Sequence, residues 1–162
     1  MGIGGCFMAV TREEFNDIRA NPEALQQRLE NEELRDREFD VDKAWDGIHF
    51  LLAGVKLGQV AVGVPPLFGD AEVEGTDFGY SPLYFLTPEQ LKDALEWMRA
   101  HAPEDMRARY DAAAFEKADI YPEIWGREDD NAIDYLIDNY IELIAYYDKA
   151  AKAGDAMLFW LG

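Results

Sequence analysis

Asp42, Asp46 and His49 are the residues of this chain whose types and spacing come closest to a catalytic arrangement. On a helix, at about 100° per residue, the three side chains fall within roughly 60° of one another, on one face. Asp46 and His49 are one turn apart, so the carboxylate can orient the imidazole as it would for a general base. This spacing favours a small hydrolase or transferase in which His49 is the base and Asp46 positions it.

A structural interpretation of the same residues is also open. His49 lies at the border of the apolar side of this segment, where a partly buried histidine bonds a backbone carbonyl. Asp42 and Asp46 are then solvated, or they cap a neighbouring helix. A hydrolase or transferase also needs a nucleophile or an electrophile stabiliser, and the sequence does not indicate which group that is.

Aromatic residues are the second candidate site. Trp45, Tyr121 and Trp125 can line a ligand pocket against the polar face that carries Asp42, because aromatic walls with a few polar groups are the usual make-up of a ligand site. The alternative is that these aromatic residues belong to the core.

Other chemical motifs are incomplete. Asp40 and Asp42 resemble the start of a calcium loop, but Ala44 and Trp45 stand where a ligand and the turn glycine belong. The single cysteine, Cys6, leaves no Cys/His cluster for zinc, and no phosphate-binding loop or nucleophile elbow is present. The sequence therefore predicts neither a metal site nor a cofactor.

The charge balance restricts the partners. The chain carries 15 basic and 33 acidic residues, a formal net charge of −18. Such a surface repels the phosphates of nucleic acids, so we expect no direct DNA or RNA binding. A basic protein is a plausible partner, which suits a non-catalytic binding or interaction module of an accessory or immunity type. Solubility alone is the other explanation of the charge.

An acidic ridge is the most concentrated part of this charge. It is formed by acids that recur every four residues: Asp130, Asp134, Asp138 and Glu142. Like charges at this spacing destabilise an isolated helix by roughly 0.2 to 0.5 kcal/mol per pair. The ridge is either an electrostatic docking surface for a basic partner or a solvated outer face that good packing elsewhere makes tolerable.

Three apolar runs are too short for helices and predict strands near residues 5–10, 83–86 and 156–161, sharing one sheet. Capping signals and helical spacing predict helices between them. The predicted helices run over about 12–20, 22–37, 40–52, from 88, over 103–117 and over 130–153. The expected fold class is α+β: a small mixed sheet of short strands covered by five or six helices, in one domain of residues 1–162.

The segment 57–81 contains several glycines and Pro65-Pro66, with little helical periodicity. It is either a functional loop or lid, or it hides a short strand such as 59–64. No stretch is long and apolar enough to span a bilayer, so we expect no membrane insertion. Together with the lone cysteine, this makes a reducing cytoplasm the expected location.

Three segments resemble one known family. They are DKAWDGIHFLL at 42–52, LTPEQ at 86–90 and YPEIW at 121–125, in this order. With the glycine-rich start and the apolar C-terminal strand, they resemble the YfbM-like family of small bacterial domains of unknown function over nearly the whole chain. The resemblance implies a soluble α+β domain of bacterial origin. It implies no activity and transfers no catalytic residue.

Overall fold

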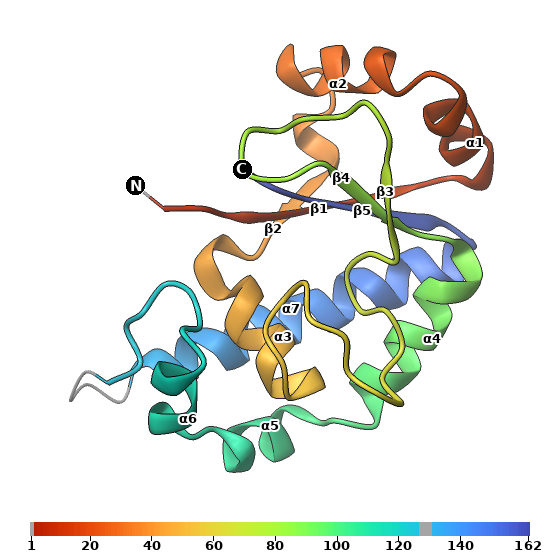
Figure 1. The fold of residues 1–162 in the computed structure, drawn as a ribbon. Helices are drawn as coiled ribbons and strands as arrows, with labels where there is room; N and C mark the ends of the chain where they lie inside the picture. The colour runs from red at the N-terminus through yellow and green to blue at the C-terminus, as the bar shows by residue number, and fades with distance from the viewer. Residues whose placement is uncertain (1, 127–130) are drawn as a thin grey trace.

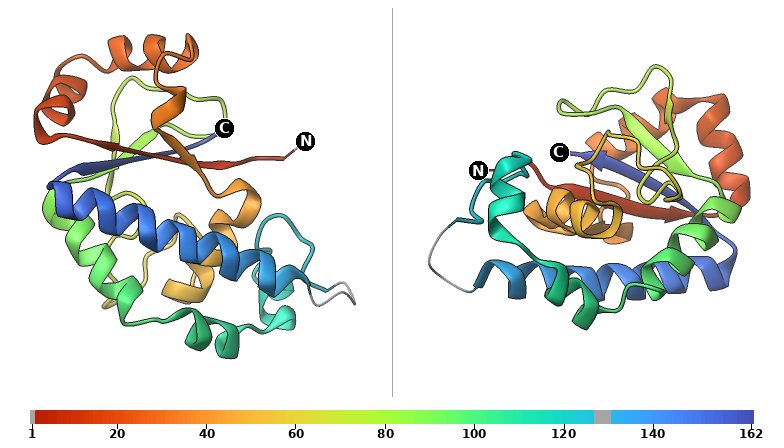
Figure 2. Two further views of the ribbon diagram at one scale, coloured as in Figure 1. Left: turned by 180° about the vertical axis from the view of Figure 1, so that it is seen from behind. Right: turned by 60° about the horizontal axis from the view of Figure 1, so that its bottom comes forward.

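A five-stranded antiparallel sheet lies between two layers of helices (Figures 1 and 2). The computed structural model describes residues 2–126 and 131–162. The strand order is β2-β1-β5-β4-β3. The strands are β1 (Gly5–Val10), β2 (Glu38–Asp40), β3 (Ala71–Val73), β4 (Leu83–Leu86) and β5 (Ala156–Leu161).

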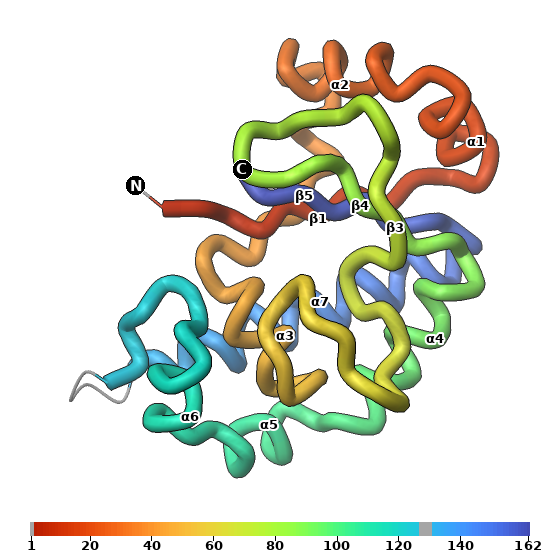
Figure 3. Tube along the Cα trace, in the orientation of Figure 1, coloured from red at the N-terminus to blue at the C-terminus, as the bar shows by residue number. Residues whose placement is uncertain are grey.

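The sheet confirms the three predicted strands, which share one sheet as β1, β4 and β5, but its pairing differs from the expectation. Every strand pair is antiparallel, so the prediction of a mixed sheet was wrong. The long connection from β4 to β5 explains this, because α4 (Pro88–Arg99) leads away from the sheet and α7 (Asn131–Ala153) returns to the same end (Figures 1 and 3). Leu86 at the end of β4 consequently lies opposite Met157 at the start of β5.

The described residues form seven α-helices, more than the five or six expected, within the expected α+β class. The capping boxes predicted at Thr11 and Thr87 are both present. One predicted helix is divided in two, because Asp111 accepts hydrogen bonds from two backbone N–H groups and begins a new helix there. The helices are α1 (Arg12–Ala20), α2 (Pro22–Glu30), α3 (Trp45–Ala53), α4 (Pro88–Arg99), α5 (Pro103–Arg109), α6 (Ala112–Lys117) and α7 (Asn131–Ala153).

The two faces of the sheet bury separate apolar clusters, because side chains alternate along a strand. Phe7 and Phe159 are opposite each other and belong to the cluster that includes residues of α3, α4 and α7. Met8 and Leu158 are the next pair and belong to the cluster that includes residues of α1 and α2. Figure 2 shows the α1–α2 hairpin on one face of the sheet and the larger helical layer on the other.

The segment 31–44 departs from the predicted helices. α2 ends at Glu30 instead of continuing to about residue 37, and β2 follows a short 3-10 turn. The helix expected over 40–52 begins only at Trp45. Asp42 has a φ of 51°, a left-handed conformation that cannot continue an α-helix, and it lies in a second 3-10 turn. Asp42 is therefore not on the same helical stripe as Asp46 and His49.

The segment 57–81 is a long loop interrupted by β3. No strand forms at 59–64, where Val60 is 93% and Val62 100% exposed. Leu67 and Phe68 are buried and join the core cluster that includes residues of α3. Leu67 and Phe68 thus anchor the loop in the core, whereas Val60 and Val62 project into solvent.

Candidate functional site

Asp46 joins three segments of the chain. Its side chain is only 1% exposed. One carboxylate oxygen accepts a hydrogen bond from the backbone N–H of Leu57 at 3.0 Å, and the other accepts one from the backbone N–H of Tyr121 at 3.0 Å. The carboxylate therefore fixes the start of the 57–81 loop and the Tyr121 loop against α3.

His49 is bonded to the backbone as well. Its Nδ1 lies 2.9 Å from the carbonyl oxygen of Val55, which acts only as an acceptor, so Nδ1 carries the proton. Burial lowers the pKa of His49 below its ordinary value of 6.5, against smaller opposing effects of the Val55 hydrogen bond and of Asp46. A neutral imidazole held in this way supports the structural interpretation.

The predicted pairing of Asp46 with His49 does not form in the described part of the chain. Each side chain instead bonds backbone groups, and the two influence each other only through space. His49 does line a hollow of about 460 Å³ beneath the 57–81 loop, together with Phe68 and Leu57. The imidazole is therefore oriented by the carbonyl of Val55 and not by the Asp46 carboxylate.

Trp45 and Tyr121 form an aromatic stack next to Asp46. Their ring centroids are 5.3 Å apart and their planes are inclined by 20°. The Trp45 indole N–H donates to the carbonyl of Ile3 at 2.9 Å, and the Tyr121 hydroxyl accepts from the N–H of Ile3 at 2.6 Å. Both rings are thereby held in place by the start of the chain.

This stack is one wall of a cavity of about 330 Å³, called here the Asp46 cavity. A second stack stands in the sheet, where the Tyr84 and Phe159 centroids are 6.4 Å apart with planes inclined by 27°. The 57–81 loop contributes Leu57 at one side and Tyr80 at the other. The cavity thus combines two pairs of stacked rings with one buried carboxylate.

Lys56 is the basic residue at the edge of the Asp46 cavity. Its ammonium group donates a hydrogen bond to the carbonyl of Asp119 at 3.0 Å, in an exposed position. Within the described residues, no cation lies within 4.0 Å of the Asp46 carboxylate, because the ion pairs of the structure involve other acids. The Asp46 charge therefore has only N–H partners.

Two other predicted ligand-binding residues lie elsewhere. Trp125 is 2% exposed and packs on Phe115 in the core, with its indole N–H bonded to the carbonyl of Ile120. Asp42 is exposed and accepts a hydrogen bond from the Tyr135 hydroxyl at 2.6 Å. The structure therefore brings Trp45 and Tyr121 together, and it separates Trp125 and Asp42 from them.

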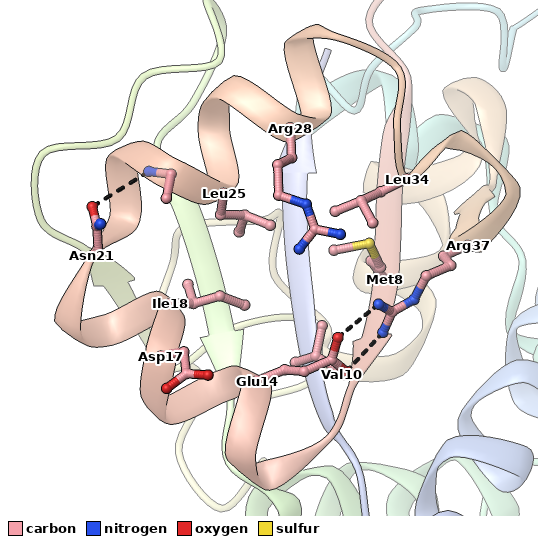
Figure 4. Close-up of a pocket in the computed structure, with 11 residues that line it drawn as sticks. Met8, Val10, Glu14, Asp17, Ile18, Asn21, Leu25, Arg28, Leu34 and Arg37 are labelled. Carbon is pink, nitrogen blue, oxygen red and sulfur yellow. Dashed lines mark hydrogen bonds and ion pairs between the residues drawn. The ribbon is translucent and has the colours of Figure 1, made fainter.

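A second cavity, of about 240 Å³, lies between β1 and the α1–α2 hairpin (Figure 4). Its floor is apolar and includes Met8 and Leu25. At its rim the Glu14 carboxylate meets the Arg37 guanidinium in two hydrogen bonds of 2.7 and 2.9 Å. Figure 4 shows the Arg28 side chain extending from α2 over the cavity. We call it the hairpin cavity.

The acidic ridge lies on the outer face of α7. Asp134, Asp138 and Glu142 are all exposed, whereas Asp130 lies outside the described residues. Asp134 forms an ion pair with Arg107 of α5 at 2.7 Å. For Asp138 and Glu142, no ion pair is formed with any described residue.

The sequence reasoning missed Lys56, Tyr84 and Phe159 as cavity residues. Lys56 is in a loop, where no periodicity indicates what a side chain faces. Tyr84 and Phe159 are on predicted strands, and alternation would have placed Phe159 on one face with Phe7. Their meeting with Trp45 depends on the pairing of β4 with β5, which the sequence does not specify.

The described residues give little support for a metal site, a reactive thiol or a membrane-spanning helix. Among residues 2–126 and 131–162, no group of three or more His, Cys, Asp or Glu side chains could hold a metal ion. Burial, with smaller effects of Asp40 and Glu38, raises the pKa of the Cys6 thiol to about 12, so it is not a thiolate at neutral pH. None of the described helices combines the length and the apolar character that crossing a bilayer requires.

Comparison with known proteins defines the class of this chain. It belongs to a family described as a domain of unknown function (DUF1877), whose model matches residues 1–160. Among solved structures, its fold is similar to that of YfbM, a protein of unknown function from Escherichia coli, with a TM-score of 0.76 and 20% sequence identity. That match covers 98% of this chain and 99% of the YfbM chain. No curated protein matches. These findings confirm the YfbM-like family and the α+β fold.

Proposed function

We propose that this protein is a non-catalytic binding module, of an accessory or immunity type, that docks a basic protein partner on the outer face of α7. The observation that carries the proposal is the composition of that face. Ile141, which is 48% exposed, lies one turn after Asp138 and precedes Glu142, beside the acidic ridge, with the exposed Ala145 one turn further along. An apolar centre with a charged rim is the usual arrangement of a protein interface.

The charges support a basic partner. Asp138 and Glu142 have no cation within 4.0 Å among the described residues, and the chain as a whole carries a net charge of −18. Carboxylates without partners keep their full attraction for an approaching cationic surface, which speeds association at low salt.

The alternative of a hydrolase or transferase has less support. The two groups that it requires, His49 and Asp46, are both bonded to backbone atoms. The dyad that this alternative assumes is not formed, because Asp46 bonds two backbone N–H groups and the His49 imidazole bonds the carbonyl of Val55. We therefore assign these two residues a structural role.

The test is a charge reversal on α7 with a matched control. Affinity purification from the host at low salt identifies the partner, and association rates are then measured across a range of ionic strengths. We expect Asp138→Lys with Glu142→Lys to slow association at least about tenfold at low salt. The control, Glu72→Lys with Glu74→Lys, changes the net charge equally on exposed residues at and after β3 and should leave the rate within about twofold.

Two results would contradict the proposal. One is a double α7 variant that associates as fast as the parent protein at low salt. The other is a control that slows association as much as the α7 variant, because net charge rather than this face would then govern the encounter. Ile141→Ser provides an independent check, since it removes the apolar centre without changing the charge and should shorten the lifetime of the complex.

A further inference from the structure

We propose that the Asp46 cavity binds a small organic cation, specifically one with a quaternary ammonium group. This inference does not depend on the proposed function, because the cavity and the outer face of α7 are built from different residues. The Asp46 cavity has a volume of about 330 Å³, which is at the lower end of the range of small-molecule sites. The proposal rests on the aromatic walls of the cavity, on its buried charge and on its hydrogen-bond acceptors, which are largely occupied.

The walls suit a cation. The Trp45–Tyr121 stack and the Tyr84–Phe159 stack both border the cavity, and Tyr80 stands at its edge with 65% of its surface exposed. Aromatic rings carry partial negative charge on their faces, and a cage of such rings is the common way in which proteins recognise quaternary ammonium groups. The Trp45 and Tyr121 rings, which are stacked and hydrogen-bonded to the backbone of Ile3, need little rearrangement on binding.

The buried charge of Asp46 also favours a positively charged ligand. Asp46 is 1% exposed and lines the cavity, and its charge is compensated by two N–H groups only. In a site with little water, such a charge acts on a ligand more strongly than it would in bulk solvent. Lys56, at the rim, acts in the opposite direction, but its ammonium group is exposed and bonded to the carbonyl of Asp119.

The hydrogen bonds distinguish between kinds of cation. A primary ammonium group carries three N–H donors, and leaving them without acceptors in a cavity costs free energy. Each oxygen of Asp46 already accepts one backbone N–H group, so the carboxylate has fewer free acceptor sites than a primary ammonium group has donors, and the hydroxyl of Ser81 is occupied by the N–H of Leu161 and the carbonyl of Pro82. A quaternary ammonium group has no donors to satisfy, so it fits this environment better than a primary amine.

Three probes that share a hydroxyethyl group test the proposal by isothermal titration calorimetry: choline, the smaller primary amine ethanolamine, and the neutral isostere of choline, which has the same size but carries carbon in place of nitrogen. We expect choline to bind with a millimolar or tighter dissociation constant, and the other two to bind at least about tenfold more weakly. Equal binding of the neutral isostere would overturn the proposal, because the cavity would then be only apolar. Equal binding of ethanolamine, or no binding of choline at tens of millimolar, would overturn it as well.

Variants locate the site and test the sign of its charge preference. Tyr84→Leu removes an aromatic face and should weaken choline binding about tenfold, whereas Tyr84→Phe keeps the ring and should bind within about twofold of the parent protein. Lys56→Gln removes the opposing charge and should tighten binding a few-fold. The proposal fails if Tyr84→Leu binds choline normally. It also fails if benzoate binds more tightly than choline and Lys56→Gln abolishes that binding, because the site would then select anions.

Discussion

The Asp46 cavity and the hairpin cavity lie on opposite faces of one sheet, and their carboxylates are used differently. In the hairpin cavity, Glu14 meets Arg37 in an ion pair whose side chains are 36% and 37% exposed. In the Asp46 cavity, the carboxylate is 1% exposed and holds two distant backbone segments. The first charge is neutralised and screened by water, whereas the second is structural and remains available to a ligand.

This difference shows why the hairpin cavity is the weaker candidate. Three of its four charged lining residues are in ion pairs, since Glu14 pairs with Arg37 and Arg28 lies 3.4 Å from Glu33, whereas Asp17 has no such pair with a described residue. A ligand would have to break these pairs or leave them in place and contact apolar side chains alone. The hairpin itself covers the sheet with two short helices, and incomplete packing beneath them explains the space.

The largest expected effect is the difference in stability loss between variants of the two carboxylates, Asp46 and Glu14. Asp46→Ala leaves the N–H groups of Leu57 and Tyr121 without their acceptor, and we expect a loss of about 3 kcal/mol in the free energy of unfolding. Glu14→Ala removes a solvent-screened ion pair and one capping bond, and should cost about 1 kcal/mol or less. Urea unfolding followed by circular dichroism measures both. If Glu14→Ala lowers the free energy of unfolding as much as Asp46→Ala does, the proposed difference between the two carboxylates is wrong.

His49 gives an intermediate effect with a characteristic pH dependence. His49→Phe removes the hydrogen bond to Val55 and should cost about 1 kcal/mol at neutral pH. Because burial lowers the pKa of His49 in the folded protein, the unfolded chain takes up the proton first as the pH falls below 6.5. The parent protein then loses stability that the variant does not lose, so the difference between them should narrow between pH values of about 7.5 and 5.

A difference that stays constant across this range would mean that the pKa of His49 is not lowered by folding. Measuring the titration of the imidazole by NMR provides the direct control. Its midpoint should lie below 6.5, and the neutral form should carry its proton on Nδ1.

The smallest expected effect concerns the charge of Glu14. The hydrogen bond from Arg37, with smaller contributions from Thr11, lowers the pKa of Glu14 from 4.5 to about 2. Its stabilising contribution is therefore complete above pH 4.5 and is lost as the pH falls toward about 2. Glu14→Gln keeps the capping bond and should cost under about 1 kcal/mol at neutral pH.

The urea midpoints of the parent protein and of Glu14→Gln are compared at each pH. The higher stability of the parent protein should disappear near pH 2. An advantage that persists unchanged at this pH would show that the ion pair is not its source.

Local signals carried most of the correct prediction of the fold. The capping boxes at Thr11 and Thr87 depend on neighbours three residues away, and the three longer strands are apolar runs bounded by turns. β2 and β3 were missed because each has only three residues, too few for a periodicity to appear. The sheet was predicted as mixed because strand direction depends on how α4 and α7 are arranged in space.

The candidate site was predicted in part. Trp45, Asp46 and Tyr121 were identified by residue type, and the structure brings them to one cavity. The role of Asp46 was not predictable, because its hydrogen-bond partners lie 11 and 75 residues along the chain. The helical pattern that suggested a dyad with His49 describes only neighbours on one helix. It contains no information about backbone groups that approach from loops.

The central claim is that the Asp46 cavity, rather than the hairpin cavity, is built to hold a ligand. The most direct measurement is a choline titration followed by NMR of the backbone amides and the tryptophan indoles. We predict that shift changes concentrate on the Trp45 indole and on the amides of Leu57, Tyr84 and Tyr121, while those of Leu25 and Arg28 stay fixed. Changes centred on Leu25 and Arg28, or changes spread evenly over the surface, would contradict the account.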